Sequence, residues 1–173
     1  EIELTEKYDL ENYNISQTYS QISSYYINTN QPEKALEALK KADATAYSPT
    51  QKISVQLEYV NYYSKFGDMQ AAEKILNECK TAFDQDKRLW SIKKRLYNIE
   101  YVYYLQSKQY PKALEAAKKQ EAEELNLSES IQNSVHYLTK GKIYSNMGNM
   151  SEAIKYLQMY IEAEDSLKIA NEQ

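Results

Sequence analysis

Residues 63–72 read YSKFGDMQAA, and the interval between the first and last letters decides the fold. Tyr63 is followed nine residues later by Ala72, with the polar break Gly67-Asp68 between them. The same interval recurs at Tyr26 and Ala35, at Tyr104 and Ala113, and at Tyr144 and Ala153. A fixed spacing that returns along a chain indicates one supersecondary unit copied several times. The sequence therefore predicts a stack of similar repeats, an architecture that offers an extended binding surface.

The composition favours helices over strands. The 173 residues contain only three Gly and three Pro, few for a protein with many tight turns. Abundant Ala, Leu, Glu and Lys favour helix formation, and strand-like runs bounded by turn residues are missing from the sequence. No Pro-, Gly- or Ser-rich linker divides the chain. We therefore expect a single all-α domain over residues 1–173.

Charge, cysteine content and hydropathy restrict the classes of function. The net charge of −4 argues against direct contact with nucleic acid, which normally needs a clustered basic face. The lone Cys79 cannot form an internal disulfide, so folding should not depend on oxidation. No apolar stretch approaches the roughly 20 residues that span a bilayer, so we expect no membrane contact by this segment. Since the sequence begins at Glu1 rather than Met, we expect a processed product or an excised fragment.

Local signals predict where the helices begin and end. The first helix of the first repeat is expected from about Glu11 to Ile27, and Ile2 to Leu10 is a candidate for a separate, ninth helix. One face of that first helix carries Ile15, Tyr19, Ile22 and Tyr26. Prolines suit the first turn of a helix, where the missing N–H is not needed. The chain places them at Pro32, Pro49 and Pro111, and the expected N-caps are Ser48 and Ser128.

The repeats resemble tetratricopeptide repeats. In that family the first helix carries a bulky residue, then a small residue and a tyrosine, and a Gly-Asp-like turn leads to an alanine in the second helix. The matching places hold Tyr19, Ser23, Tyr26, Asn30-Gln31 and Ala35; Gln56, Val60, Tyr63, Gly67-Asp68 and Ala72; Tyr97, Tyr101, Tyr104, Lys108-Gln109 and Ala113; and Tyr137, Gly141, Tyr144, Gly148-Asn149 and Ala153. The resemblance implies a right-handed α-α superhelix of four helix pairs, at about 16–49, 53–86, 94–127 and 134–167, with 168–173 extending the last helix.

Two departures from the family pattern predict local irregularity. The four alanines are 37, 41 and 40 residues apart, against a usual period of 34. The excess lies between the second helix of one repeat and the first helix of the next, so we expect longer helices or loops there. Tyr101 stands where a small residue usually permits close contact, which makes the third repeat the least regular.

The sequence offers no convincing catalytic or metal-binding arrangement. His136 is the only histidine, which excludes multi-histidine metal sites, and we expect it to be a half-exposed structural residue. Cys79 occupies a small, buried place in its repeat rather than the electropositive setting of a reactive thiol. We therefore expect no catalytic residue, no metal and no cofactor, and we do not expect an enzyme.

The resemblance implies that a protein or peptide partner lies in a concave groove lined by the first helices. The groove residues carried over from the family are Gln17, Gln21, Ser24, Asn28, Leu57, Glu58, Asn61, Lys65, Arg95, Asn98, Ile99, Val102, Gln106, Leu138, Lys142 and Asn146. A subgroup of the family grips C-terminal carboxylates with a Lys/Asn/Arg set. Only Arg95 fits that set, because four other places hold Ser20, Ser24, Glu58 and Ile99. We exclude that subgroup.

Two interpretations of this binding module remain open. Residues 156–161, YLQMYI, and the tail to Gln173 resemble the last repeat of bacterial tetratricopeptide sensors. That resemblance implies the sensory part of a bacterial signalling or regulatory protein, placed outside the cytoplasm, with a membrane span and an output domain after Gln173. The alternative is a freestanding cytoplasmic scaffold or peptide-binding regulator. The residues that follow Gln173 in the full gene would distinguish the two.

Overall fold

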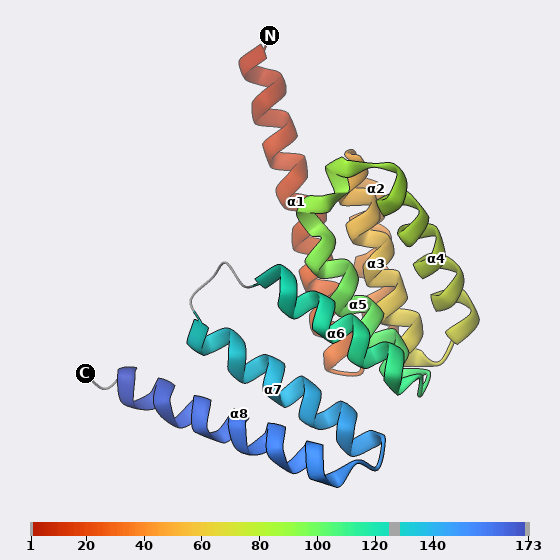
Figure 1. Cartoon of the computed structure of the whole chain (residues 1–173). Helices are drawn as coiled ribbons and strands as arrows, with labels where there is room; N and C mark the ends of the chain where they lie inside the picture. The colour runs from red at the N-terminus through yellow and green to blue at the C-terminus, as the bar shows by residue number, and fades with distance from the viewer. Residues whose placement is uncertain (1, 125–128, 172–173) are drawn as a thin grey trace. The chain divides into compact units, whose positions relative to one another are not determined.

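The computed structural model describes the backbone of residues 2–124 and 129–171, and the side chains of residues 15–123 and 134–169. Within those ranges the chain is all-α, with helices and no strand (Figure 1). The helices are α1 (Ile2–Asn28), α2 (Pro32–Thr45), α3 (Pro49–Phe66), α4 (Met69–Gln85), the 3-10 helix η1 (Lys87–Ile92), α5 (Lys93–Gln106), α6 (Tyr110–Glu124), α7 (Glu129–Asn146) and α8 (Met150–Asn171). The predicted fold class is confirmed.

Contacts divide the chain into an N-terminal unit, Glu1–Ile99, and a C-terminal unit, Glu100–Gln173. In the N-terminal unit, α3 packs against α1, α2 and α4, α1 also packs against α2, and η1 packs against α3 and α4. In the C-terminal unit, α7 packs between α6 and α8. Helices adjacent in sequence therefore pack as neighbours, as a helical repeat requires. A single domain with a right-handed superhelix stays a prediction.

Backbone hydrogen bonds explain the interval of nine residues. In the first hairpin the carbonyl of Tyr26 accepts from the N–H of Gln31, five residues later, at 2.9 Å. The carbonyl of Gln31 then accepts from the N–H of Ala35, four residues further on, at 3.0 Å. The same two bonds recur from Tyr104 to Ala113 and from Tyr144 to Ala153. Each alanine is almost fully buried in its helix, so the interval fixes both the turn and the contact that follows it.

Each hairpin turn contains a residue in the left-handed backbone conformation, which is glycine in two of the turns and another residue in the other two. Gly67 and Gly148 have φ values of 97° and 75°, while Asn30 and Lys108 occupy the corresponding region at 58° and 59°. A left-handed residue commonly ends a helix because its N–H can reach back to a carbonyl in the last turn. Glycine adopts this conformation at little cost, whereas a lysine has no such freedom.

The predicted helix starts at the prolines are confirmed. Pro32 and Pro49 are the first residues of α2 and α3, and Pro111 lies in the first turn of α6. Ser48 is the N-cap of α3 and forms a capping box with Gln51, so each side chain bonds the other residue's backbone N–H. The predicted cap Ser128 lies outside the described residues.

The buried face of α1 differs from the predicted one. Ile15 and Ile22 are 41% and 37% exposed, whereas the positions one residue further along are buried: Ser16, Ser20, Ser23 and Ile27. The small serines allow neighbouring helices to approach closely, and the Ser16 hydroxyl donates to the carbonyl of Ala42 at 2.9 Å. The predicted start at Glu11 is also wrong, because α1 runs unbroken from Ile2 and includes the segment proposed as a ninth helix.

The longest interval between repeats is filled by η1. This six-residue 3-10 helix lies between α4 and α5, within the 41 residues that separate Ala72 from Ala113. Asp86 caps it, with its carboxylate accepting from the N–H of Arg88 at 2.9 Å. The extra length therefore falls between two helix pairs, as predicted.

Candidate ligand-binding pocket

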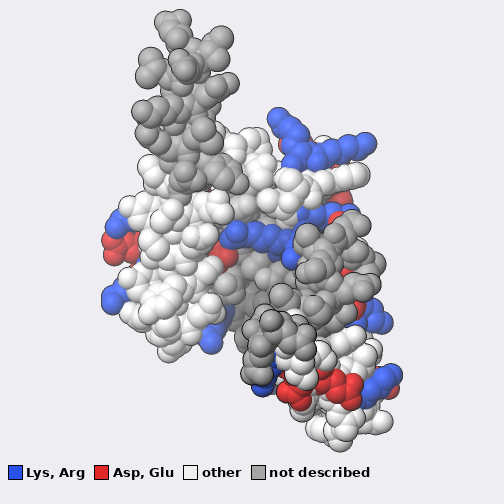
Figure 2. All heavy atoms as spheres, turned by 90° about the vertical axis from the view of Figure 1, so that its left-hand side faces the viewer, with Lys and Arg blue, Asp and Glu red and all other residues white. Residues whose placement is uncertain are grey.

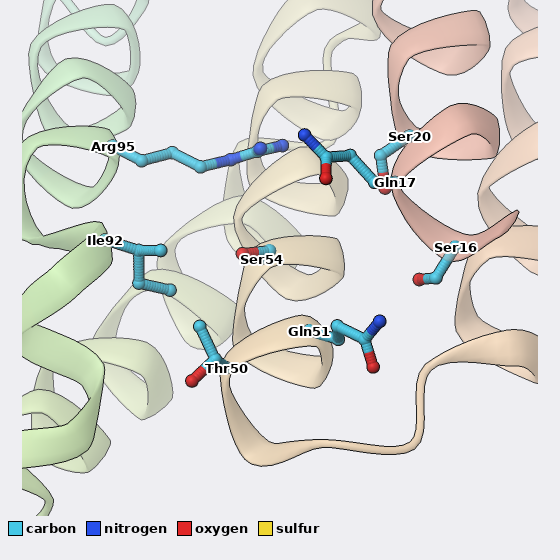
Figure 3. A pocket seen from close by; sticks show the side chains of 8 residues that line it. All are labelled: Ser16, Gln17, Ser20, Thr50, Gln51, Ser54, Ile92 and Arg95. Carbon is cyan, nitrogen blue, oxygen red and sulfur yellow. The ribbon is translucent and has the colours of Figure 1, made fainter. Parts of the chain in front are cut away.

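A polar pocket lies in the N-terminal unit where the first helices of three successive pairs come together (Figure 3). Its volume is about 120 Å³. Three of its lining residues come from α1, three from α3, and two from the end of η1 and the start of α5. They are Ser16, Gln17, Ser20, Thr50, Gln51, Ser54, Ile92 and Arg95. Ile92 is the apolar member of this set, and each of the other lining residues carries a hydrogen-bonding group as well as apolar carbons.

Gln51 has its amide orientation fixed by the start of α3. Its Oε1 accepts from the backbone N–H groups of Tyr47 and Ser48 at 3.2 and 3.1 Å. Because an amide oxygen accepts and an amide nitrogen donates, reversing the group would set donors against donors. The Nε2 of Gln51 consequently points away from this loop, and it has no hydrogen-bond partner. Gln51 is 5% exposed, so this donor is unsatisfied in a buried position.

Arg95 borders the pocket and is held by a buried carboxylate. Its Nη2 donates to Glu58 Oε1 at 2.7 Å, and the side chains of Glu58 and Arg95 are 7% and 33% exposed. Asn61 also donates to Glu58 Oε2, at 3.4 Å. A guanidinium carries five N–H donors. One bond to Glu58 therefore fixes the position of Arg95 and leaves other donor directions of its head group for the pocket.

The serines of α1 and α3 complete the lining. Ser16 and Ser20 are 1% and 4% exposed, while Thr50 and Ser54 are half-buried. Figure 3 shows the side chains of Gln17 and Arg95 extending toward each other from opposite sides of the pocket, with Gln51 and Thr50 at the other end. Hydroxyl groups both donate and accept, so the walls can serve a ligand that carries both kinds of group.

The structure brings some of the predicted groove residues together and buries others. Gln17 and Arg95 line the pocket. Eight predicted residues are exposed: Gln17, Gln21, Asn28, Lys65, Asn98, Gln106, Lys142 and Asn146. Five are half-buried: Ser24, Asn61, Arg95, Val102 and Leu138. A partner role for any of these residues stays a prediction.

Three predicted groove residues are buried and need correction. Leu57 is fully buried, and Glu58 and Ile99 are 6% and 4% exposed. Their side chains fill helix contacts instead of presenting a surface, because the helix face that contains them turns inward. Glu58 acts on the pocket only through Arg95. Conversely, the sequence analysis did not predict four lining residues, although the Ser48-to-Gln51 spacing of a capping box is visible in the sequence: Ser16, Thr50, Gln51 and Ile92.

The two other side chains that could take part in chemistry, His136 and Cys79, are both buried. His136 is 5% exposed, buried rather than half-exposed as expected. Burial raises the pKa of the Cys79 thiol to about 12, and Glu78 adds to that shift. Among the residues described, no group of three or more His, Cys, Asp and Glu side chains is placed to hold a metal ion. Nor does any helix in the described ranges have the length and apolar character to cross a membrane.

The charged side chains on the visible face are mixed. Figure 2 shows blue Lys and Arg groups and red Asp and Glu groups separated by wide uncharged areas. Among the residues coloured there, no field of one sign extends across the face.

Comparison with known families gives two matches. A family model described as 26S proteasome subunit RPN7 matches residues 1–117, which include the whole N-terminal unit and its pocket. A model described as tetratricopeptide repeat matches residues 137–166, across α7 and α8. No curated protein and no solved structure matches the chain.

Proposed function

The chain belongs to the family of 26S proteasome subunit RPN7, and from this membership we propose that it is a non-catalytic helical-repeat subunit of a multi-protein assembly. Its work would be to hold partner proteins, and the proteasome in the family's description is an example of such an assembly. The tetratricopeptide match over α7 and α8 supports the same kind of role, since stacked helix pairs offer extended binding surfaces.

The pocket is the structural observation that supports a partner-binding role. Side chains from α1, α3, η1 and α5 converge on one recess, and the outermost of them, Ser16 and Arg95, are 79 residues apart in the sequence. The buried bond between Glu58 and Arg95 holds one wall in place. Preorganised donors lower the entropy that a partner must lose on binding. We infer that partner segments bind here, and that Gln17 and Arg95 contact them.

The interpretation as a bacterial membrane-bound sensor stays a second, weaker prediction. It depends on residues 156–161 and the tail, and the family match over residues 1–117 does not involve them. A freestanding scaffold agrees better with the family description. An apolar run of about 20 residues after Gln173 in the full gene would favour the sensor instead.

Sedimentation of the tagged chain in an extract of its own source tests the proposed function. The free chain has a mass of 20.2 kDa. We expect most of it to sediment with a much larger assembly and to co-purify with the same subunits in fixed ratio. The variant Arg95→Lys, which keeps a cation for Glu58 but removes the planar guanidinium, should shift material toward the free position. Sedimentation of the wild-type chain as a free monomer would contradict the proposal.

A further inference from the structure

The outer face of α8 carries large apolar side chains that are exposed to solvent. Met150, Ile154 and Ile161 are 55%, 55% and 56% exposed, and we call these three residues the α8 stripe. They are four and seven residues apart, so they lie along one line of the helix. α7 packs against another side of α8, where Leu157 lies against Gly141. An exposed apolar line on a helix indicates contact with another helix.

The place of α8 in its repeat supports this interpretation. α8 is the second helix of the tetratricopeptide match over residues 137–166. In a repeat array, a helix whose outer face meets water is polar on that face. The α8 stripe is instead apolar, although Lys155 and Glu162 lie directly beside it in the sequence. We therefore expect the stripe to be covered when the protein is assembled.

The charged residues beside the stripe indicate what covers it. Ile154 and Ile161 are seven residues apart, and the residues that follow them, Lys155 and Glu162, have the same spacing. Seven residues extend about 10 Å along a helix, so these two charges do not pair within one α8. Lys155 has only a long contact of 3.9 Å with Glu152. Glu162 is exposed and, within the described part of the chain, makes no ion pair.

A second copy of α8, running antiparallel to the first, complements both the stripe and the charges. A two-fold axis brings one surface patch against the same patch of the other copy. Because the two spacings are equal, one register sets Ile154 against Ile161 of the second copy and also brings Lys155 to Glu162 of the second copy. The axis makes each of these contacts twice. We propose that the α8 stripe is the interface of a homodimer. The dimer goes beyond the function given above, since it would bring two copies of the pocket into one assembly.

Sedimentation equilibrium of the purified chain tests the proposal. We expect a dimer with twice the chain mass of 20.2 kDa, and a dissociation constant on the order of 10 μM because one helix pair is a small interface. Ile161→Glu buries a charge in the stripe and should weaken the dimer at least about hundredfold, with unchanged helical circular dichroism. The matched control is Ile15→Glu, the same change at a residue of α1 that is 41% exposed. It should form the dimer like the wild type.

Exchange of the charges tests the antiparallel register. Lys155→Glu and Glu162→Lys each set like charges against each other across the axis, so each variant alone should associate about tenfold more weakly. A mixture of the two variants should recover the wild-type affinity within about threefold, because every pair across the interface is then of opposite sign. An effect inside one chain cannot produce this recovery, since each chain in the mixture keeps its own substitution.

The other outcomes overturn the proposal. A purified wild-type chain that stays monomeric would show that the stripe does not bind a second copy, and a dimer that Ile161→Glu leaves intact would place the interface elsewhere. A mixture of charge variants that stays weak would exclude the antiparallel pairing. These measurements use the purified chain, so a monomer here leaves the extract experiment on the proposed function valid. Conversely, a homodimer that sediments alone in the extract would contradict the proposed function and support the interface.

Discussion

The N-terminal and C-terminal units each contain a largely buried ion pair between helices, but they bury opposite partners. In the N-terminal unit the carboxylate of Glu58 is 7% exposed and the side chain of Arg95 is 33% exposed. In the C-terminal unit the side chain of the cation, Lys140, is 10% exposed, and the side chain of the carboxylate, Glu121, is 29% exposed. The two bonds are nearly equal in length, at 2.7 and 2.6 Å. The difference therefore lies in which charge would be left in the protein interior if its partner were lost.

The surroundings of the two cations explain what each pair is used for. Arg95 borders a polar pocket, with part of its guanidinium unbound to Glu58. The Lys140 ammonium instead lies 5.5 Å from the centre of the Tyr156 ring, and that ring stacks on Tyr144 at 5.5 Å. The first arrangement keeps a recess lined by donors, whereas the second closes the contact between α7 and α8 with aromatic rings. We infer that the first pair supports binding and the second supports packing.

The largest expected effect follows from removing the cation of the N-terminal pair. Arg95→Met would leave the Glu58 carboxylate buried with only the long contact to Asn61. A buried charge without its partner is strongly destabilising, so we expect a loss of about 3 kcal/mol in the free energy of unfolding. Urea denaturation followed by the fluorescence of Trp90 measures it, since this single tryptophan lies in the N-terminal unit.

A double variant distinguishes this explanation from a simple loss of packing. If the unpaired carboxylate causes the instability, Glu58→Met combined with Arg95→Met should recover most of the lost free energy, because replacing both partners removes the buried charge. Recovery of less than half would show that the Arg95 contacts themselves, rather than the charge of Glu58, account for the loss.

The matching change in the C-terminal unit should cost less. Lys140→Met leaves the Glu121 carboxylate, which is more exposed than Glu58 and can reach water, while the new methionine keeps an apolar contact with Tyr156. We expect a loss of about 1.5 kcal/mol, measured by circular dichroism in urea. The Trp90 transition should move less than it does for Arg95→Met. A loss as large as that of Arg95→Met would remove the contrast between the two pairs.

The contrast also shows which features a sequence can predict. The interval from Tyr26 to Ala35 could be predicted because it results from two consecutive hydrogen bonds within one hairpin. The start of α3 at Ser48 and Pro49 could be predicted for the same reason, because helix capping depends on residues close in sequence. The buried face of α1 could not, because Ile15 and Ile22 are exposed whereas three serines of this helix are buried. Only contacts with neighbouring helices, such as Ser16 with Ala42, decide which side turns inward.

The pocket was predictable only in part for a related reason. Gln17 and Arg95 followed from the family resemblance, since that resemblance assigns the first helices to a groove. Gln51 did not, because a capping residue has a sufficient local explanation, and its place in the pocket lining depends on α1 and α5 lying beside the start of α3. The burial of Leu57 and Ile99 was likewise set by helix rotation, which repeat spacing does not determine.

Two buried serines of α1 test how contacts with neighbouring helices stabilise its buried face. We expect changes in the free energy of unfolding that are smaller than those predicted for the ion pairs. The hydroxyl of Ser16 donates to Ala42, whereas the Oγ of Ser23 is buried without a hydrogen-bond partner. Since an unsatisfied buried hydroxyl is unfavourable, Ser23→Ala should stabilise the N-terminal unit by about 1 kcal/mol. Ser16→Ala, the matched control on the same helix, should destabilise it by a similar amount. Equal signs for the two changes in urea denaturation would contradict the difference in hydrogen bonding.

The smallest effect at ordinary pH is expected for Cys79 on α4, because its thiol stays protonated in the folded chain. Burial raises the pKa to about 12 from an ordinary value of 9.0. Below about pH 8 both the folded and unfolded states hold the proton almost completely, so Cys79→Ala should show no pH-dependent difference from the wild type there. Between pH 9 and 12 the unfolded state loses the proton first, so the wild type should lose stability relative to the variant, by about 1 kcal/mol at pH 10.

The rate of thiol labelling measures the burial of Cys79 directly. Iodoacetamide at pH 8.5 should label Cys79 rapidly in urea and slowly without it. Rapid labelling of the folded chain would show that α4 opens more readily than its burial implies.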